Sequence, residues 1–373
     1  MGPLAGVRVL EMEAVGPIIH AGMLLADLGA EVVRVARATT RRTGHVVEDP
    51  NAAMLRGRTQ VSLDLKDPVA RASCFELVRA ADVLLEGARP GVMERLGLGP
   101  DECLEVNPGL VYGRLSGWGQ SGPMAALAGH DINYVALAGA LEPMGPPGAP
   151  PLPPLNYVGN FGGGSMYLLV GVLSALHERS RTGRGQVVDA AMLDGASTLT
   201  ALLRSWQHAG HWSPQRGTNV LDGSAPYYRV YACADGRHMA VGAIEDVFYG
   251  RLVQGLGLDI ETLPDRSDRD CWPALTETFT AAFAARTRDQ WEKAFRGIDA
   301  CVTPVLSLAE SAEHPHAVAR GAFVETGGVT MPAPGPRLSS VGPPPPALVH
   351  GDVAAVLDAW RIRSSGDGEP APG

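Results

Sequence analysis

Residues 7–37 read VRVLEMEAVGPIIHAGMLLADLGAEVVRVAR and carry the clearest fold signal in this chain of 373 residues. The apolar run over residues 7–13 predicts a strand, and the helical pattern over residues 18–28 ends at Gly29. A second apolar run, residues 31–37, predicts another strand. Strand, helix and strand in this order form a β-α-β unit, the repeating element of doubly wound α/β folds.

The turn after the first strand lacks the glycine pattern of a dinucleotide site. Dinucleotide folds place Gly-x-Gly-x-x-Gly in this turn and an acidic residue after the second strand, where it holds a ribose diol. Here the second predicted strand ends at Arg37. Because an arginine suits a phosphate better than a ribose, the sequence argues against a nicotinamide cofactor.

Strand and helix patterns continue to alternate up to about residue 200. Short apolar or alternating runs predict strands within residues 54–66, 83–86, 111–116 and 187–192. Helical patterns lie at residues 69–80, 129–140, 166–176 and 194–210, with a short helix around Arg95. This alternation indicates the α/β fold class, with a parallel sheet covered by helices on both faces.

The pattern changes near residue 225. A β-hairpin is predicted over residues 226–241, helices over residues 248–296 and a strand over residues 300–306, which together indicate a smaller α+β domain. The predicted boundaries are 1–200 and 330–362 for the large domain, 201–224 for a linker helix and connector, 225–329 for the small domain, and 363–373 for a disordered tail.

Composition narrows the possible functions. A net charge of −9 gives no electrostatic support to nucleic-acid binding. No uninterrupted apolar run reaches the roughly 18 to 20 residues of a membrane span, and the N-terminus does not read as a signal peptide, so we expect a cytoplasmic protein without a membrane partner. The cysteines are scattered and form no Cys-x-x-Cys pair, so we expect free thiols and no metal site.

The glycine-rich stretch PLNYVGNFGGGS, residues 154–165, precedes an apolar helical run. Consecutive glycines allow a backbone to approach another group closely. We expect a loop at the N-terminus of a buried helix, whose N–H groups can stabilise a phosphate, a carboxylate or an enolate oxygen. This stretch is therefore the predicted centre of the functional site.

Several motifs together resemble one protein family. They are LAGVRVLEM (4–12), LLADLGAEVVRV (24–35), SLDLK (62–66), ADVLLEGARPG (81–91), GHDINY (129–134) and RTGRGQVVDAAM (181–192). With this set the chain resembles, from about residue 3 to residue 340, the α-methylacyl-CoA racemases of the family III CoA-transferase superfamily, also called CaiB/BaiF. The GHDINY motif favours the racemase branch over the CoA transferases.

The resemblance implies an architecture and a substrate. It implies a Rossmann-like large domain, a small domain, and a homodimer of two interlocked chains. The substrate is an acyl-CoA thioester held between the large domain of one subunit and the small domain of the other, so CoA enters with the substrate and no separate cofactor is implied. Arg37, Arg56 and Arg95 match positions expected to hold the CoA phosphates, and Lys66 and Arg89 are weaker candidates.

The resemblance also implies the proton carriers. In the family, a histidine at the position of His130 and an aspartate in a Gly-Asp-Phe-Gly-Gly-Gly motif exchange protons with the α-carbon from opposite faces. A glutamate similar to Glu245 supports the histidine. The chemistry agrees, because an α-proton beside a thioester is a weak acid and needs both a base poised near neutrality and donors for the enolate oxygen. An imidazole suits the first task, and backbone N–H groups of the glycine-rich stretch suit the second.

This chain has Asn160 where the family has that aspartate. A carboxamide can hydrogen-bond but cannot exchange a proton near neutral pH. The same position supplies the nucleophilic aspartate of the CoA transferases, so Asn160 argues against both reactions. The chain is then either a disabled racemase or a divergent member with one proton-transfer group. We expect rapid deuterium exchange at the α-carbon of one substrate epimer and slow interconversion of the two epimers, unless Asp131 or His20 acts as the second proton carrier.

Three hypotheses remain open from the sequence. The first is an isomerase acting at the α-carbon of an acyl-CoA, by racemisation or by a one-base variant such as double-bond migration. The second is a CoA transferase, and the third is a CoA-thioester binder without chemistry. Deuterium incorporation at the α-position separates the first from the others.

Overall fold

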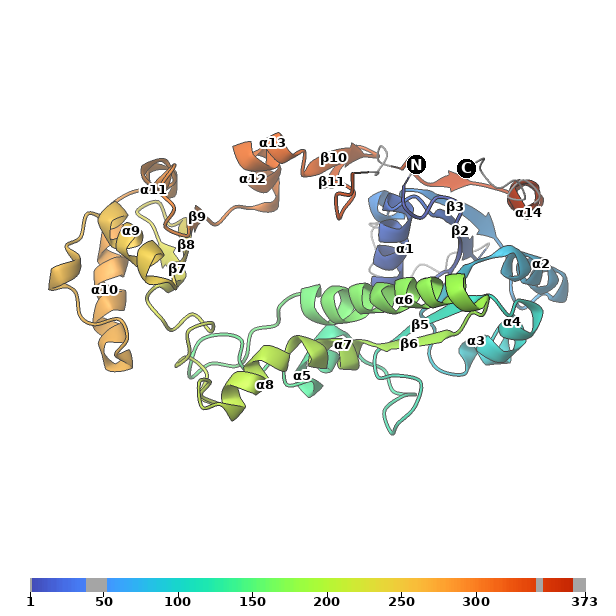
Figure 1. Ribbon diagram of the computed structural model, residues 1–373, viewed down its shortest axis with the longest axis horizontal. Helices are drawn as coiled ribbons and strands as arrows, with labels where there is room; N and C mark the ends of the chain where they lie inside the picture. Colours follow the sequence, from blue (N-terminus) through green and yellow to red (C-terminus); the bar gives the residue numbers. More distant parts are fainter. Residues whose placement is uncertain (1, 38–51, 340–344, 365–373) are drawn as a thin grey trace. The chain divides into compact units, whose positions relative to one another are not determined.

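The computed structural model describes residues 2–37, 52–339 and 345–364, and the chain divides into two compact units (Figure 1). Unit 1 comprises residues 1–138, 154–200 and 315–373, and unit 2 comprises residues 139–153 and 201–314. Segments 139–153 and 201–224, which we predicted to be parts of the large domain and the linker, belong to unit 2. Residues 315–329, predicted in the small domain, belong to unit 1.

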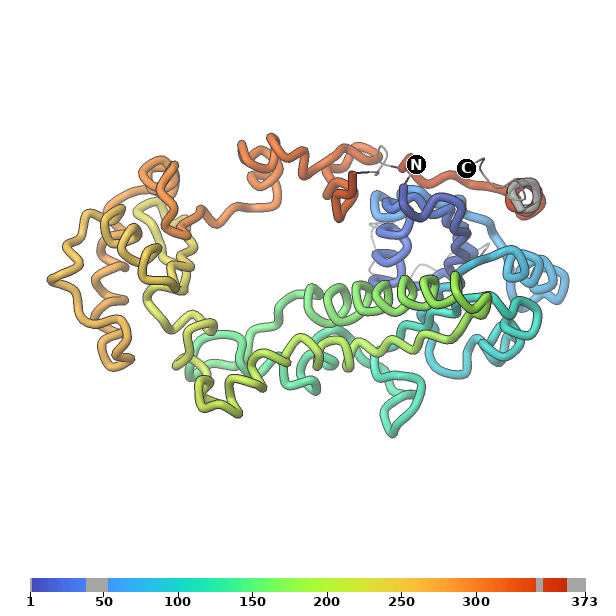
Figure 2. Tube along the Cα trace, viewed as in Figure 1, coloured from blue at the N-terminus to red at the C-terminus, as the bar shows by residue number. Residues whose placement is uncertain are grey.

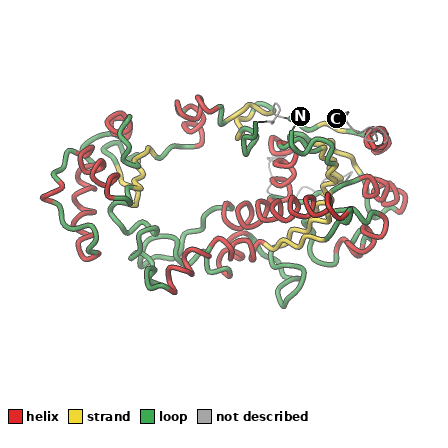
Figure 3. Tube along the Cα trace, in the orientation of Figure 1, coloured by secondary structure: helices red, strands yellow, loops and turns green. Residues whose placement is uncertain are grey.

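Unit 1 is built on a parallel sheet of seven strands in the order β12-β3-β2-β1-β4-β5-β6. Figure 3 draws the strands of the chain in yellow. The strands are β1 (Arg8–Met12), β2 (Glu31–Ala36), β3 (Arg58–Ser62), β4 (Val83–Glu86), β5 (Val111–Ser116), β6 (Val187–Ala191) and β12 (Val349–His350). The α/β fold class with a parallel sheet is thereby confirmed.

Helices cover both faces of this sheet. They are α1 (Pro17–Asp27), α2 (Pro68–Ala80), α3 (Val92–Arg95), α4 (Pro100–Val106), α5 (Asp131–Leu137), α6 (Tyr167–Thr182), α7 (Met192–Leu199) and α14 (Val353–Ser364), with the 3-10 turn η1 (Ala52–Leu55). Because side chains of a strand alternate between faces, neighbouring residues of β1 enter different cores. Leu10 packs with Leu77 and Trp360, whereas Val9 packs in the core that contains Leu25 and Leu168.

The C-terminal part of the chain returns to the sheet of unit 1. The short helix α13 (Pro315–Arg320) precedes the antiparallel pair β10 (Phe323–Thr326) and β11 (Val329–Pro332). β12 then pairs with β3, and α14 packs on α2, so the red and blue ends of the trace meet in Figure 2. The predicted disordered tail lies outside the described residues from residue 365, and its first two residues end helix α14.

Unit 2 contains a three-stranded antiparallel sheet and helices around an aromatic core. The strands are β7 (Tyr228–Ala232), β8 (His238–Gly242) and β9 (Val302–Pro304), and the first two form the predicted hairpin. The helices are α8 (Ala201–His208), α9 (Asp246–Leu256), α10 (Trp272–Phe283), α11 (Arg288–Phe295) and α12 (Leu308–Glu313), with the 3-10 turns η3 (Ile260–Thr262) and η4 (Arg269–Cys271). The single helix predicted over residues 194–210 is instead the two helices α7 and α8, which meet at Thr200.

One continuous helical stretch, Tyr157–Thr182, passes a membrane-span test by length and composition alone. In this structure 44% of its apolar window is buried, and its α6 part packs on β5 and β6 (Figure 1). Burial against a sheet of the same unit is typical of a core helix.

Candidate functional site

The strand order places a ligand edge at the carboxyl ends of β1 and β4. From β1 the sheet continues through β2 and β3 on one side and through β4, β5 and β6 on the other, so the direction of winding reverses between these two strands. Ligands of open α/β sheets bind in the crevice outside the carboxyl ends at such a point. The loop after β4 lies against the loop after β1 and the start of α1, because a Cβ added at Gly87 would lie 3.2 Å from Cβ of Ala14 and 2.8 Å from Cγ1 of Ile18.

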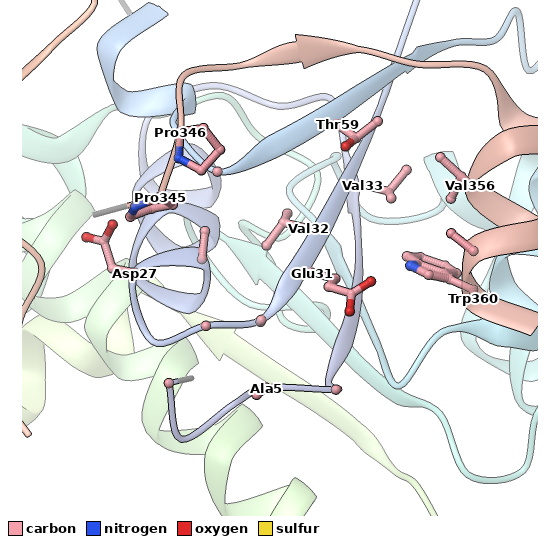
Figure 4. A pocket seen from close by; sticks show the side chains of 17 residues that line it. Ala5, Asp27, Glu31, Val32, Val33, Thr59, Pro345, Pro346, Val356 and Trp360 are labelled. Atoms are coloured by element: carbon pink, nitrogen blue, oxygen red, sulfur yellow. The ribbon is translucent and has the colours of Figure 1, made fainter. Parts of the chain in front are cut away.

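A cavity of about 700 Å³ lies at the opposite, amino edge of the sheet (Figure 4). It is bounded by the first residues of β2, including Val32 and Val33, by Asp27 at the end of α1, and by Pro346 and Trp360 of the C-terminal return. None of the residues that we predicted for the functional site lines this cavity. We therefore build the site at the carboxyl edge.

Four of the predicted phosphate ligands are exposed near that carboxyl edge. Arg37 follows β2, Lys66 follows β3, Arg89 follows β4, and Arg95 ends the short helix α3. Arg89 also lies near Tyr134 of α5. Burial raises the pKa of Tyr134, and the positive charge of Arg89 opposes that increase. These cations can reach an anionic ligand that lies along the edge.

Arg56 is placed differently from the other predicted cations. Its guanidinium is buried and donates to both carboxylate oxygens of Asp27, with Nε–Oδ1 and Nη2–Oδ2 distances of 2.8 and 2.5 Å. A bidentate pair of this kind already occupies the face of the guanidinium that would bind a phosphate. In this geometry Arg56 fixes the end of α1 and has no access to a phosphate.

The glycine-rich stretch is helical, which corrects the expected loop. Residues Tyr157–Met166 form the π-helix η2, which continues directly into α6. The reason is close packing on α7, because a Cβ at Gly163 would lie 2.5 Å from the backbone nitrogen of Ala196, and one at Gly195 would lie 1.9 Å from the carbonyl oxygen of Gly163. Short π-helical segments inside longer helices often mark functional sites.

Asp131, rather than solvent, receives the N–H groups at the start of this π-helix. Its Oδ1 accepts a hydrogen bond from the backbone nitrogen of Asn160 at 2.5 Å, and the N–H of Gly159 also points to the carboxylate. Burial is the largest influence on Asp131 and raises its pKa, although the two N–H groups oppose this. Its Oδ2 is buried and has no hydrogen-bond partner among the residues that the structure describes. The backbone donors that we expected to face an enolate are therefore partly taken up inside the protein.

The Asn160 side chain lies beside the turn that begins α1. A Cβ added at Gly16 would be 3.6 Å from Asn160 Nδ2, and Gly16 adopts a positive φ of 57°. The carboxamide is half-buried and makes no hydrogen bond to a residue in the described part of the chain. It is therefore free to donate to or accept from a ligand.

His20 makes a second contact between α1 and the π-helix, in addition to the contact of Gly16 with Asn160. Its Nδ1 is 2.6 Å from Oγ of Ser165, and its ring is 4.6 Å from the ring of Phe161. Burial lowers the pKa of His20 below its ordinary value; the cations Arg58 and Arg56 act in the same direction and Asp27 acts against them.

Buried charges beneath α1 were not identified from the sequence. Glu11 of β1 and Arg58 of β3 form a fully buried ion pair with an Nη2–Oε2 distance of 3.0 Å, and Arg58 Nη2 also donates to the carbonyl oxygen of Ile19. Gly22 is required above this pair, because a Cβ there would lie 2.0 Å from Glu11 Oε2. The two charged residues are 47 positions apart, so only parallel pairing of the strands brings them together.

His130 is the residue that precedes α5, and its side chain is exposed. The Asn133 side chain accepts a hydrogen bond from its backbone N–H at 3.0 Å, which fixes the start of the helix. Because Asp131 follows directly and contacts Asn160, His130 stands at the same end of α5 as the glycine-rich helix. Glu245 is exposed at the start of α9 in unit 2, and its predicted support of His130 stays a prediction.

No group of three or more His, Cys, Asp or Glu that could hold a metal ion occurs among the described residues. The chemistry open to this site is hydrogen bonding by a carboxamide, proton transfer by two imidazoles, and charge pairing with anionic ligands by the cations of the edge.

Comparisons with known proteins give the site a context. The family model for CoA-transferase family III matches residues 4–348. The chain is 46% identical over 333 residues to the alpha-methylacyl-CoA racemase of Mus musculus, which covers 89% of this chain and 85% of that protein. It is 31% identical over 367 residues to the acetyl-CoA:oxalate CoA-transferase of Acetobacter aceti, which covers 92% of this chain and 91% of that protein.

The fold also matches solved structures. The crystal structure of a CAIB/BAIF family protein from Brucella suis superimposes with a TM-score of 0.81 at 24% identity. The match covers 97% of this chain and 99% of that chain. At this identity the likeness establishes the fold alone.

Proposed function

This chain belongs to CoA-transferase family III, and from that premise we propose that it transfers protons at the α-carbon of acyl-CoA thioesters. The reaction is that of an α-methylacyl-CoA racemase or epimerase and passes through an enolate. CoA enters as part of the substrate, and the proposal needs no separate cofactor or metal.

The observation that carries the proposal is the pair of groups at the carboxyl edge, an imidazole at residue 130 and a carboxamide at residue 160. A CoA transferase of this family needs a carboxylate nucleophile to carry the acyl group, and a carboxamide cannot serve as one. Proton transfer by His130 needs no nucleophile. The higher identity to a racemase, 46% against 31% to a CoA transferase, supports the same choice.

In this mechanism His130 removes the α-proton of one epimer. The electron pair of the broken C–H bond moves into the thioester as an enolate, whose oxygen needs a hydrogen-bond donor. Asn160 supplies that donor through its Nδ2, because its carboxamide is half-buried and engaged by no described residue. Asp131 holds the start of the π-helix in place and so positions both groups.

The exposed cations of the carboxyl edge hold the CoA phosphates. The candidates for these contacts are Arg37, Arg89 and Arg95, and Lys66 is a further, weaker candidate. Arg56 is left out of this set because Asp27 already pairs with it.

We also propose that the enzyme is a homodimer. Helix α6 exposes Tyr167, Val170 and Leu173 on one face. The most exposed of the three is Val170, at 65%. An exposed apolar stripe on a helix whose opposite face packs on the sheet supports an interface with a second copy. In the dimer Glu245 of the partner subunit approaches His130 and orients its imidazole.

The proposal is tested by incubating the protein with a 2-methylacyl-CoA in deuterated water and following the mass of the α-position. A carboxylic acid acceptor is present in a parallel reaction, so that CoA transfer is measured on the same preparation. Deuterium without transfer supports the isomerase, and transfer without deuterium supports the CoA transferase. Thioester binding with neither reaction supports a non-catalytic binder. His130→Ala is the control that abolishes exchange by His130.

A further inference from the structure

We propose that His20 is the second proton carrier of this site, taking the role for which Asn160 is chemically unsuited. The two faces of the α-carbon are then served by two imidazoles, those of His130 and His20. This inference rests on the proposed function and names a further catalytic residue for the same reaction.

Hydrogen bonding around Ser165 fixes which nitrogen of His20 carries the proton. The Ser165 hydroxyl donates to the carbonyl oxygen of Phe161 at 3.1 Å. A hydroxyl has a single proton, so with that proton directed at Phe161 we assign Ser165 Oγ as the acceptor from His20 Nδ1, which lies 2.6 Å away. In neutral His20 the proton is therefore on Nδ1, and Nε2 carries the basic lone pair.

That lone pair remains available to a ligand. Nε2 of His20 makes no hydrogen bond to a residue in the described ranges, and this atom is not fully buried. The atom therefore keeps access to solvent. A neutral imidazole with one nitrogen anchored and the other accessible is the usual arrangement of a general base.

The position of His20 relative to the site is fixed from two sides. Helix α1 begins at the carboxyl end of β1, and its first turn lies against Asn160 through Gly16. From below, the buried Arg58 donates to the carbonyl oxygen of Ile19, the residue before His20. His20 thus reaches the π-helix at Phe161 and Ser165, whereas the element that carries His130 reaches it at Gly159 and Asn160.

Asp131 is the other residue that could take this role, and its geometry is less suitable. Its Oδ1 is occupied by the N–H of Asn160, and its Oδ2 is buried. With one oxygen buried and the other already accepting a hydrogen bond, this carboxyl group is less suited than His20 to meet an α-proton. His20 also favours the neutral, basic form, since burial and the cations Arg58 and Arg56 lower its pKa, with Asp27 opposing them.

The proton balance of the step is simple. The epimer whose α-hydrogen faces His20 loses that proton to Nε2, and the C–H electron pair forms the enolate. A protonated His130 then delivers its proton to the opposite face and closes a new C–H bond. One imidazole gains a proton and the other loses one, and exchange with water resets the pair.

The experiment measures deuterium incorporation into each epimer separately, using purified epimers of a 2-methylacyl-CoA in deuterated water. His20→Asn is the informative variant, because its carboxamide nitrogen can still donate to Ser165 while the Nε2 base is lost. His130→Asn removes the base of the other face. His208→Asn, on the exposed side of α8, is the matched control.

Wild type is expected to exchange both epimers. His20→Asn is expected to lose exchange of one epimer by about 10² to 10⁴-fold and to keep exchange of the other, because a positioned base contributes a factor of that size. A merely structural role of His20 would slow both epimers alike. Equal retention of both rates in His20→Asn would therefore overturn the proposal, as would an equal loss of both.

Two further outcomes separate this inference from the proposed function. Wild type that exchanges only the epimer dependent on His130 would overturn the role of His20 and leave the isomerase standing. Wild type that exchanges neither epimer would overturn both.

Discussion

The carboxylate of Asp131 accepts the backbone N–H of Asn160 across 2.5 Å and thereby joins the start of α5 to the start of the π-helix. This contact requires glycine at residue 159, because a Cβ there would lie 2.6 Å from Asp131 Oδ1. His130, which precedes Asp131 in the chain, and Asn160, which donates this bond, are two of the three residues that we assign to the reaction. Asp131 therefore acts as a positioning residue.

Asp131→Asn is expected to change how stability depends on pH. Burial raises the pKa of Asp131 in the folded protein, so its contribution to the free energy of unfolding is greatest at acidic pH and is lost as pH rises through the folded pKa. Asparagine retains the acceptor and has no such titration. Urea unfolding of both proteins from pH 4 to pH 8 should show wild type losing stability relative to the variant as pH rises. A constant difference across this range would contradict the assignment.

Gly195→Ala is expected to disrupt the packing of α7 on the π-helix. The new methyl group would lie 1.9 Å from the carbonyl oxygen of Gly163, and backbone atoms cannot move aside as a side chain can. Overpacking of this kind costs about 1 to 3 kcal/mol or more. Gly250→Ala is the matched control, since no atom lies within 4 Å of a Cβ there, and alanine stabilises a helix by up to about 1 kcal/mol. Equal stability of the two variants in urea unfolding would show that glycine contact does not hold the π-helix.

The sequence predicts structure that is set by local patterns better than structure that is set by contacts between residues far apart in the chain. The β-α-β unit over residues 7–37 is set by local apolar patterns, and β1, α1 and β2 follow the prediction to within about two residues. The glycine-rich stretch was expected to be a loop because consecutive glycines allow a backbone to approach another group closely. It is helical because Gly163 meets Gly195, a contact between residues far apart in the chain.

The same distinction applies to the site residues. Arg56 reads as an available cation until the fold brings Asp27 to its guanidinium. His20 reads as one histidine of an apolar helix until Ser165 is found beside it. Arg89 is exposed and follows β4, so its position is set directly by where a strand ends, and its binding of a CoA phosphate stays a prediction.

Charge reversal at the carboxyl edge is expected to weaken CoA-thioester binding. A charge-assisted hydrogen bond contributes about 1.5 to 3 kcal/mol, so Arg37→Glu or Arg95→Glu should lower affinity by several fold to hundreds of fold. Arg56→Gln should instead lower stability and leave affinity nearly unchanged, because its partner is Asp27. Calorimetry with a CoA thioester, paired with unfolding of each variant, measures both quantities. Unchanged affinity in both charge reversals would remove these arginines from the CoA site.

Val170→Glu is expected to dissociate the proposed homodimer, since it places a charge in the exposed apolar stripe of α6. Val69→Glu is the control, because Val69 is 74% exposed on a different helix. Sedimentation equilibrium measures the mass, and deuterium exchange of the acyl-CoA measures activity. We expect a monomer with little exchange, because Glu245 of the partner subunit is then missing. A dimer with Val170→Glu would place the interface elsewhere, and an active monomer would remove the need for Glu245.

The decisive measurement starts from a single epimer of a 2-methylacyl-CoA in deuterated water and follows both the mass and the configuration of the α-carbon with wild-type protein. An enolate with one proton carrier on each face predicts that the opposite epimer forms and that it carries a solvent deuterium at the α-position. Recovery of the starting thioester with neither deuterium nor inversion, under conditions where it binds, would contradict proton transfer at this site.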